Sequence, residues 1–182
     1  MKKLLTIILS VLLAITMTAC KTEQKEEEEK FVIGICQIEA HAALDAATQG
    51  FKDALIAEFG EDKLVFIDGN AAGDPATCAT ICNGFVADGV DMILANSTPA
   101  LQAAASATTT IPILGTSVTE YGVALNIEDF NGLTGFNVSG TSDLAPLDEQ
   151  AQMIIDIMPE VKTVGILYSS SEANSIYQVK VV

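Results

Sequence analysis

The chain has 182 residues and a formal net charge of −15, with nine Lys, no Arg and 24 Asp plus Glu. A chain this acidic repels polyphosphate, which argues against a nucleic-acid partner, and the lack of Arg removes any bidentate guanidinium clamp on a phosphate or a carboxylate. The hydrophobic content of 49% excludes disorder as the state of the chain beyond residue 30.

The first 19 residues have the three parts of an export signal. Two lysines precede a mostly apolar stretch over residues 4–13, and a segment of small residues then leads to Cys20. The apolar stretch is short for a membrane span; the alternative to a signal peptide is an anchor helix or an inefficiently cleaved signal. Residues 17–20 read MTAC and resemble a bacterial lipobox, in which the cysteine is acylated, as with palmitate, and becomes the new N-terminus. We therefore predict a signal peptide over residues 1–19 and lipidation of Cys20.

Residues 20–30 hold the predicted lipidated cysteine and an acidic tether. Four consecutive Glu, residues 26–29, cannot bury anything and favour an extended, solvated linker. The folded part is therefore expected at the extracytoplasmic face of the cell membrane, held there by the lipid anchor. The remaining 152 residues, 31–182, amount to one ordinary domain.

From residue 31 onward, short apolar runs alternate with amphipathic stretches, which predicts an α/β fold with a parallel sheet and helices on both of its faces. The predicted strands are residues 31–36, 64–67, 92–95, 111–114 and 163–168. Five helices are predicted. The first ends before Gly60, the second is capped by Asp74 ahead of Pro75, and the third is capped by Thr98 ahead of Pro99. The fourth covers residues 144–158 and buries Leu147, Ala151, Ile154 and Met158, and the fifth begins near Ser171.

Residues 121–142 interrupt this alternation. They are turn-rich and hold four Gly, and only a short run over residues 123–125 looks extended. We therefore predict a first α/β lobe over residues 31–125, an inter-lobe crossover over 126–143 and the start of a second lobe over 144–182. Since a parallel sheet needs several strands covered on both faces, we expect the second lobe to be incomplete and the sequence to be the front portion of a longer protein.

Three cysteines lie in the predicted fold. Cys78 and Cys82 are spaced to share one helix face with Phe85, and that spacing aims their Cβ vectors poorly for a disulfide. Two thiols without a nearby His or a further Cys make a weak metal signal. We therefore predict that Cys36, Cys78 and Cys82 are small buried hydrophobic residues, and that the protein has no metal site and no cofactor.

Ligands of an open parallel sheet bind beyond the carboxyl ends of the strands. This rule selects four hydroxyl-rich loops over residues 37–41, 96–98, 115–120 and 169–174, none of which contains Lys or Arg. Helix N-termini at such loops attract one carboxylate, and nearby acidic side chains suit an ammonium group, so the loops favour a zwitterion. The predicted ligand-binding residues are Gln37, Glu39, His41, Ser97, Thr98, Thr116, Ser117, Glu120, Asp143, Ser170, Ser171 and Asn174.

Most of the predicted residues have an expected role. The ligand carboxylate is expected to contact four hydroxyl residues, Ser97, Thr98, Thr116 and Ser117. Either Asp143 or Glu120 is expected to receive the ammonium group, while the loop over residues 169–174 closes over the ligand. Two alternatives stay open at this point, because helix capping explains Thr98 equally well and a purely structural role explains His41.

Enzyme functions find little support in the sequence. Neither G-x-G-x-x-G after the first predicted strand nor G-x-x-x-x-G-K occurs, which argues against dinucleotide and P-loop chemistry. Residues 115–119, GTSVT, begin like a nucleophile elbow but have Thr119 where the second Gly belongs. A catalytic triad would have to use His41, the single histidine, from the opposite end of the lobe. We therefore expect a protein that is not an enzyme.

Several separated segments resemble, in order and spacing, the substrate-binding lipoproteins of the tryptophan/tyrosine-type ABC transporter family. The segments are QIEAHAALD (37–45), STPALQAA (97–104), IPILGTSVT (111–119), NVSGTSD (137–143) and ILYSSSEANS (166–175). The resemblance implies a type I periplasmic-binding fold, in which two α/β lobes joined by hinge strands close on a small ligand. It also implies delivery of that ligand to an ABC permease and its ATPase, and members of the family are associated with aromatic amino acids.

The leading hypothesis is therefore an extracytoplasmic solute-binding lipoprotein of an ABC importer, with a small zwitterionic ligand such as an aromatic amino acid in the inter-lobe cleft. Its partners would be that ligand, the permease with its ATPase, and the membrane through the lipid anchor. Two alternatives stay open: an extracytoplasmic ligand sensor coupled to a receptor, and a truncated fragment with no activity of its own.

Overall fold

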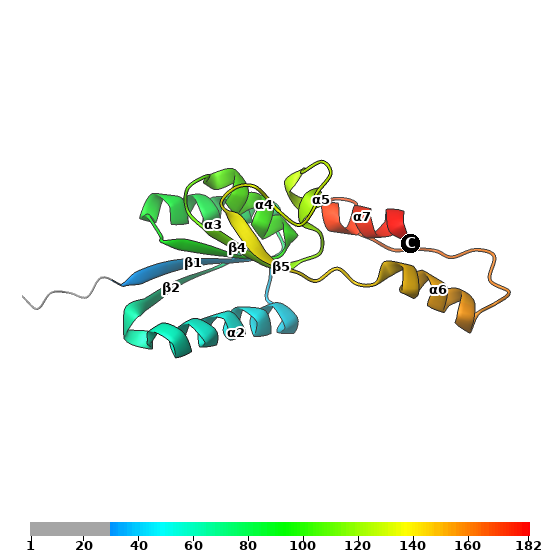
Figure 1. Ribbon diagram of the computed structural model, residues 1–182, viewed down its shortest axis with the longest axis horizontal. Coiled ribbons are helices and arrows are strands. Elements are labelled where there is room, and N and C mark those ends of the chain that lie inside the picture. Colours follow the sequence, from blue (N-terminus) through cyan, green and yellow to red (C-terminus); the bar gives the residue numbers. More distant parts are fainter. Residues whose placement is uncertain (1–29) are drawn as a thin grey trace, which may run out of the picture.

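A parallel five-stranded sheet forms the centre of the computed structural model, which describes residues 30–182 (Figure 1). The strands are β1 (Phe31–Gln37), β2 (Leu64–Asn70), β3 (Met92–Asn96), β4 (Ile113–Val118) and β5 (Val138–Ser142). Their order across the sheet is β2-β1-β3-β4-β5, and every neighbouring pair is parallel. The predicted signal peptide, the predicted lipidation of Cys20 and nearly all of the predicted tether lie outside the described residues.

Helices cover both faces of this sheet, as Figure 1 shows. One face carries α2 (Ala42–Phe59); the other carries α3 (Pro75–Asp88) and α4 (Thr98–Ala107), and a 3-10 turn, η1 (Glu61–Lys63), links α2 to β2. The two faces hold separate apolar clusters, in which Ile33, Ile35, Leu64 and Leu94 pack with residues of α2, while Cys36, Ile93, Ile113, Phe85 and Leu101 pack on the opposite side. The predicted α/β class, with a parallel sheet covered on both faces, is confirmed.

The helix ends follow from local capping chemistry. The Asp74 carboxylate accepts hydrogen bonds from Ala76 N (3.0 Å) and Thr77 N (3.2 Å), ahead of Pro75, as predicted. The Thr77 hydroxyl and these amides hold the pKa of Asp74 below its usual value. Gly60, with a φ of 90°, donates its N–H to Ile56 O and ends α2 as predicted.

The predicted cap of α4 is wrong by one residue. Ser97, and not Thr98, is the N-cap, because Ser97 Oγ accepts the hydrogen bond from Ala100 N at 3.2 Å. Thr98 is the first helical residue and its side chain is buried.

The stretch over residues 121–142 contains two regular elements that the sequence does not reveal. Residues 123–125, predicted to be extended, belong to the short helix α5 (Tyr121–Leu125), because the Glu120 carboxylate accepts hydrogen bonds from Gly122 N (2.9 Å) and Val123 N (2.6 Å). Residues 138–142, read as part of a turn-rich connection, form the edge strand β5. Its sequence, VSGTS, has one buried residue, Val138, so it lacks the apolar pattern of the other strands.

The chain after the sheet consists of α6 (Leu147–Ile157), an extended connection and α7 (Ala173–Val181). The predicted strand over residues 163–168 is wrong: these residues form no strand, and they are exposed. No other strand of a second sheet is present in the described part of the chain, so this apolar run has no neighbour to pair with. Of the predicted buried residues of α6, Leu147 is buried, two are half-buried, and Met158 is 51% exposed.

Cys36, Cys78 and Cys82 are fully buried free thiols in the cluster between β1 and α3, as predicted. Hydrogen bonding with the two neighbouring thiols, together with burial, raises the pKa of Cys36 far above its usual value, so this thiol stays neutral.

Within residues 30–182, no helix combines the length and the hydropathy that a membrane crossing requires.

Candidate functional site

The candidate site lies at the carboxyl edge of the sheet, where three neighbouring strands end side by side. Gln37 on β1 pairs with Asn96 on β3, and Asn96 pairs with Thr116 on β4, so the three residues form one row across the sheet. The loops that follow these strands lead into α2, α4 and α5. Parallel strands end at the same edge, which is where open α/β sheets bind ligands. The structure thus brings three of the four predicted loops to one edge.

Two serines at this edge have backbone conformations that L-residues rarely adopt. Ser97, directly after β3, has a φ of 132°, and Ser117, near the end of β4, has a φ of 55°. The register of β4 against β5 also shifts between Gly115 and Val118. Strained backbone costs about 1–3 kcal/mol per residue and collects at functional sites, as do bulges that redirect side chains. The two serines therefore mark this edge as the candidate site.

The N-terminus of α4 offers fewer donors to a ligand than the sequence suggests. Ser97 Oγ accepts from Ala100 N, and Ser97 O accepts from Leu101 N at 3.0 Å. Pro99 has no N–H to offer. Among the hydrogen bonds of residues 30–182, the N–H of Thr98 has no acceptor. This N–H is therefore the donor of the first turn that is free to meet a carboxylate.

Thr116 and Ser117 supply free hydroxyl groups beside that donor. Both residues are half-buried, and neither hydroxyl has a hydrogen-bond partner in the described part of the chain. A hydroxyl can donate one hydrogen bond and accept two, so each can contact a ligand oxygen. The hydroxyl of Ser97, in contrast, is already used as the cap of α4. The binding roles of all four hydroxyl residues stay predictions.

The two candidate acceptors for an ammonium group differ in what else they contact. The Glu120 carboxylate is occupied by two backbone N–H groups at the start of α5. Asp143 is exposed, and its backbone N donates to Val118 O at 3.0 Å, which keeps the residue beside the end of β4. Burial, followed by the charge of Asp143, raises the pKa of Tyr121 to about 12. Of the two carboxylates, Asp143 is the one whose charge is not committed to a helix cap.

Gln37 lies beneath the edge rather than on it. It is 7% exposed, and its Nε2 donates to Glu39 O and to Asp45 Oδ1, each at 2.7 Å. Its Oε1 accepts from Thr48 Oγ1 at 2.8 Å and from Asn96 Nδ2 at 3.3 Å. Both ends of the amide are therefore occupied by protein groups.

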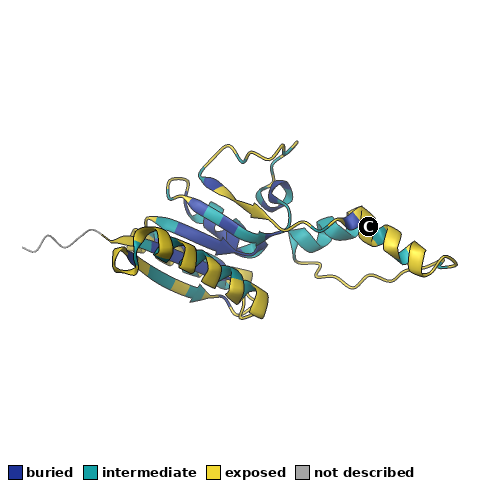
Figure 2. Cartoon of the chain, turned by 60° about the horizontal axis from the view of Figure 1, so that its bottom comes forward, coloured by how far each residue is buried: buried dark blue, intermediate teal, exposed yellow. Residues whose placement is uncertain are grey.

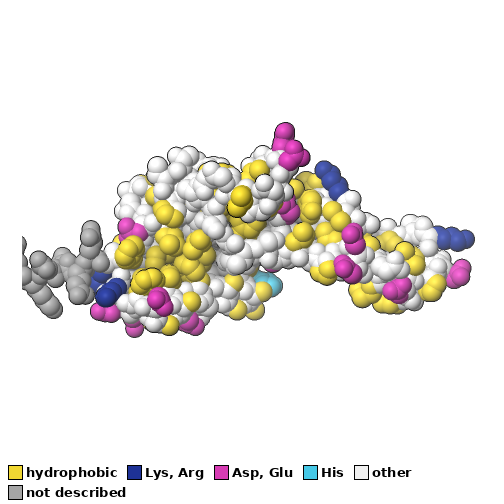
Figure 3. Space-filling model, in the orientation of Figure 1, with side chains coloured by type: hydrophobic (Ala, Val, Ile, Leu, Met, Phe, Trp, Pro, Cys, Tyr) yellow, Lys and Arg dark blue, Asp and Glu magenta, His cyan; other side chains and the backbone are white. Residues whose placement is uncertain are grey.

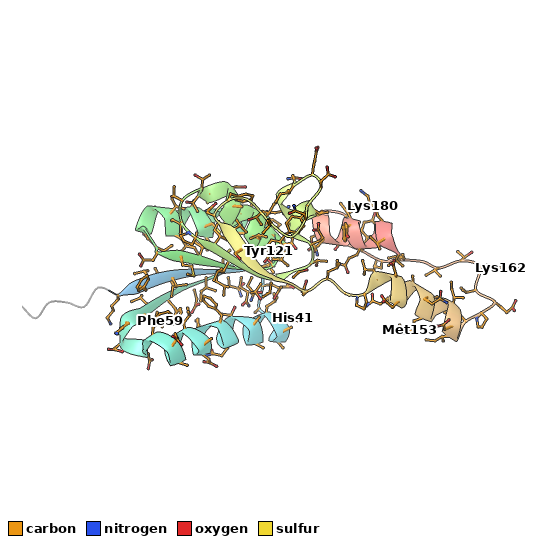
Figure 4. All side chains as sticks on the ribbon, viewed as in Figure 1. His41, Phe59, Tyr121, Met153, Lys162 and Lys180 are labelled. Atoms are coloured by element: carbon orange, nitrogen blue, oxygen red, sulfur yellow. The ribbon has the colours of Figure 1, made fainter. Side chains whose placement is uncertain are left out.

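Glu39 and His41 are both exposed. Nδ1 of His41 accepts from Ala43 N at 3.2 Å, so this residue is the N-cap of α2, in line with the structural alternative. Figure 4 shows His41 at the start of α2, on the side of the sheet where the chain leaves for α6, and Figure 3 shows its imidazole, the cyan group, at the surface. Its position permits a ligand contact, which stays a prediction.

The fourth predicted loop belongs to the part of the chain that follows the sheet. Ser170 and Ser171 are exposed, and Asn174 is half-buried near the start of α7, where its Oδ1 has no partner within residues 30–182. α7 packs against α5 and α6. A cavity of about 440 Å³ is lined by residues around α5, Glu120 among them, and by Tyr177 of α7. Closure of this loop over a ligand stays a prediction.

Sequence reasoning missed four residues of this edge, namely Asp45, Thr48, Asn96 and Tyr121. The first three are joined to Gln37 by side-chain hydrogen bonds that span 8 to 59 residues of sequence. Tyr121 packs over Gly115 and Gly140, and its hydroxyl donates to Thr141 O at 3.2 Å. The available signal was weak: a polar residue directly after each apolar run, and two Gly at one height in neighbouring strands. Among residues 30–182, no group of three or more His, Cys, Asp or Glu side chains could hold a metal ion.

Comparisons with known proteins agree on one family. Residues 32–182 match the model of a family described as "ABC transporter substrate binding protein". A curated tyrosine-binding protein from Clostridioides difficile is 37% identical over an alignment of 203 positions, which covers 98% of this chain and 55% of that protein.

Three solved structures are similar to the chain over about half of their own length. A conserved domain protein from Vibrio cholerae has a TM-score of 0.76 and 36% identity, with 84% of this chain and 52% of that chain covered. An ABC domain from Streptococcus pneumoniae, in complex with L-Trp, has a TM-score of 0.76 and 37% identity over 84% of this chain and 52% of that one. A ligand-free, open substrate-binding protein with adhesive properties from Clostridium difficile has a TM-score of 0.65 and 38% identity, covering 82% and 51%. The expected type I periplasmic-binding-like fold with a partial second lobe is confirmed.

Proposed function

Because this chain belongs to the ABC transporter substrate-binding protein family, we propose that the complete protein is the extracytoplasmic solute-binding lipoprotein of an ABC importer. We propose that its ligand is a small zwitterion, an aromatic amino acid such as tryptophan or tyrosine, held between two lobes. Relatives that bind tyrosine and L-Trp support this ligand class. The chain spans about half the length of these relatives, so the ligand, the permease and the ATPase are proposals for the whole protein.

The observation that carries the proposal is the pair of strained serines, Ser97 and Ser117, at adjacent strand ends. A chain gains nothing for folding from two L-residues in this conformation. The free N–H of Thr98 and the free hydroxyls of Thr116 and Ser117 belong to the same two strand ends and are the donors that we propose for the ligand. These are uncharged donors, which suit one carboxylate better than a doubly charged phosphate.

Charge complementarity selects the other end of the ligand. Within residues 30–182 no Lys or Arg belongs to the three loops at the edge, and the uncommitted carboxylate of Asp143 lies beside them. A ligand with both a carboxylate and an ammonium group satisfies both features. In this mechanism the first lobe binds first, the chain that leaves β5 near the end of the predicted crossover acts as the hinge, and the loop over 169–174 of the second lobe closes the cleft. Ligand binding favours closure only if the closed form binds more tightly.

The proposed anchor rests on the sequence MTAC at residues 17–20, after an apolar leader and before an acidic tether. A lipid on Cys20 would hold the protein at the extracytoplasmic face of the membrane, near the permease. Mass spectrometry of the mature N-terminus tests this part of the proposal. A mature chain that begins with an acylated Cys20 is expected; a retained Met1 without lipid would contradict it.

Nuclear magnetic resonance tests the ligand on the chain as it exists, because it detects the weak binding expected of one lobe. We expect the amide signals of Thr98 and Ser117 in the nitrogen-15-labelled chain to shift on titration with L-tryptophan or L-tyrosine. Tryptamine, which has no carboxylate, and N-acetyl-L-tryptophan, which has no ammonium group, are the matched controls and are expected to bind more weakly. No shift at either amide with either amino acid would overturn the proposal.

The Ser117→Ala variant locates the carboxylate. Alanine keeps the strained backbone and removes a hydroxyl that has no partner within the described residues, so the stability of the domain should not change. A hydrogen bond to a charged group contributes about 1.5–3 kcal/mol, so the affinity for L-tryptophan should fall by roughly 10- to 150-fold. The Ser97→Ala variant should also weaken binding, but it removes the cap of α4 as well.

A further inference from the structure

A network of polar side chains joins β1, β3 and α2 next to the candidate site, with Gln37 and Asn96 buried, Thr48 half-buried and Asp45 exposed. Asn96 is 0% exposed, and its Nδ2 donates to Leu44 O (2.8 Å), to Thr48 Oγ1 (2.9 Å) and, more weakly, to Gln37 Oε1 (3.3 Å). Thr48 Oγ1 donates to Gln37 Oε1 at 2.8 Å, and Gln37 Nε2 donates to Asp45 Oδ1 at 2.7 Å. The network therefore connects residues that lie up to 59 positions apart in the sequence.

The direction of every hydrogen bond in this network is fixed by its surroundings. Leu44 O can only accept, so the nitrogen of the Asn96 amide must face it. The Asp45 carboxylate and Glu39 O can only accept, so the nitrogen of the Gln37 amide must face them, which leaves Gln37 Oε1 for the Thr48 hydroxyl. Neither amide can be reversed without placing two acceptors against each other. The network consequently has a single arrangement.

The network lies on the α2 side of the sheet, where β1 and β3 end. Gln37 follows Ile33 and Ile35 on the same face of β1, and Asn96 follows Leu94 on the same face of β3; those three apolar residues pack against α2. Gln37, Asp45 and Thr48 also line a cavity of about 260 Å³ with residues of β2. On this face the polar atoms of Gln37 and Thr48 are bonded to protein groups, which leaves neither side chain free to meet a ligand.

The backbone next to the network does belong to the site. Gln37 Nε2 holds the carbonyl of Glu39, and Asn96 O accepts from Ile38 N at 3.4 Å, so the loop that leads to His41 is tied to the network at two points. Asn96 immediately precedes the strained Ser97. A shift of either amide side chain would therefore move a rim loop.

One feature separates this network from an ordinary core. Oδ1 of Asn96 is buried without a partner within residues 30–182, which costs free energy that an apolar side chain at this position would avoid. Retention of a half-satisfied amide at this depth fits a demand for one defined geometry at the adjoining loops.

We infer that Gln37, Thr48 and Asn96 are positioning residues, which set the geometry of the loop over residues 38–41 and of Ser97 without contacting the ligand. This inference rests on the proposed function and gives Gln37 a positioning role in place of the predicted ligand contact. The network fixes the first turn of α2 against the ends of β1 and β3, and the rim donors take their places from it.

Thr48 offers the sharpest test because its hydroxyl joins both amides. Thr48→Val keeps the shape and removes the hydroxyl, whereas Thr48→Ser keeps the hydroxyl. Thr80→Val is the matched control, since Thr80 is an exposed helix residue of α3 whose hydroxyl bonds only within its own helix. We expect Thr48→Val to shift the amide signals of Ile38, Ser97 and Thr98 in the free chain. We also expect it to weaken L-tryptophan binding about tenfold, and Thr48→Ser to restore both properties.

The outcomes separate the positioning role from the proposed function. If the unaltered chain binds neither L-tryptophan nor L-tyrosine while Thr48→Val still shifts the rim amides, the proposed function fails and the positioning role stands. If the unaltered chain binds and Thr48→Val leaves both the rim amides and the affinity unchanged, the positioning role is overturned. Urea unfolding of each variant checks folding; should Thr48→Val unfold, Thr48→Ala removes the same hydroxyl in a residue that favours helix and decides the question in the same way.

Discussion

Leu101 and Leu167 carry the same side chain in two regions of the described chain, yet Leu101 is 0% exposed and Leu167 is 101% exposed. Leu101 lies in α4 against the sheet of residues 31–142, where every strand has a neighbour. Leu167 lies in the apolar run after α6, where no strand is paired. Figure 2 shows the contrast, with largely buried central strands β1 and β3 and a largely exposed α6 and connection. Apolar composition therefore predicts a tendency toward burial, and the presence of neighbouring elements decides whether burial occurs.

Leu167 is not the one exposed apolar residue in the described chain after the sheet. Hydrophobic side chains gather over α6 in Figure 3, and Ile157 is 70% exposed. The relatives that the chain matches are about twice as long, which agrees with a second lobe that is present here in part. Four pairs of variants, each with one member in either region, test this difference in burial.

The largest expected effect comes from the two leucines. Leu101→Ala should lower the free energy of unfolding by about 2–5 kcal/mol, because it removes buried apolar contacts and leaves a cavity. Leu167→Ala should leave that free energy unchanged. Urea unfolding followed by circular dichroism measures both. Equal losses for the two variants would show that Leu167 is buried in solution, against the exposure described above.

The second pair is formed by two glycines. Gly115→Ala places a Cβ against the hydroxyl of Tyr121, whereas Gly165→Ala finds open space. We expect Gly115→Ala to destabilise by about 1–3 kcal/mol through overpacking, and Gly165→Ala to stay within about 0.5 kcal/mol of the parent chain. Urea midpoints distinguish the two. A neutral Gly115→Ala would mean that Tyr121 does not pack between β4 and β5.

The third test uses pH. Tyr121→Phe removes the hydrogen bond to Thr141 O and should cost about 0.5–1.5 kcal/mol near neutral pH. The folded pKa of Tyr121 is raised from 10.0 to about 12, so its contribution is complete below pH 10 and is lost as the pH rises from 10 to about 12. The difference in unfolding free energy between the parent and the variant should therefore shrink over that interval.

Tyr168→Phe in the exposed region is the control for this pH series, since Tyr168 is 48% exposed. It should leave the unfolding free energy unchanged. A parent and a Tyr121→Phe variant that lose stability in parallel above pH 10 would contradict the buried state of the Tyr121 hydroxyl.

The smallest expected effect comes from two helix caps. Asp74 accepts two backbone hydrogen bonds at the start of α3, whereas Glu172, the N-cap of α7, makes no side-chain cap bond. Asp74→Ala should lower the urea midpoint and Glu172→Ala should not. The pKa of Asp74 is depressed, so its contribution is present above pH 3.8 and is lost as the pH falls through the lowered value. A pH-independent effect of Asp74→Ala would show that its charge does not matter.

Much of the fold is predictable because its signals are local. The first four strands follow apolar runs, and the Asp74–Pro75 and Gly60 signals lie within four residues of the helix ends that they fix. Residues 163–168 show the limit of such signals. The same apolarity that predicts a strand there carries no information about whether a neighbouring strand is present.

The remaining differences arise from contacts distant in sequence. Strand β5 is stabilised by pairing with β4 and not by its own residues, of which only Val138 is buried. The candidate edge could be predicted, since a strand end before a helix is a local pattern. The hydrogen bonds of Gln37 could not, because its partners Thr48 and Asn96 come from two other elements. Likewise, Ser97 caps α4 with a backbone φ of 132°, and no pattern of residues in the sequence predicts that conformation.

The three thiols between β1 and α3 give this protein a built-in reporter. Cys36, Cys78 and Cys82 are closed to solvent, so an alkylating dye can reach them only when the sheet and α3 separate. The rate at which peptides containing these residues gain the mass of the dye therefore counts opening events of the first lobe. An amino acid that binds this lobe would lower the rate of alkylation of these cysteines. The size of that decrease would rank candidate ligands without any label on the ligand itself.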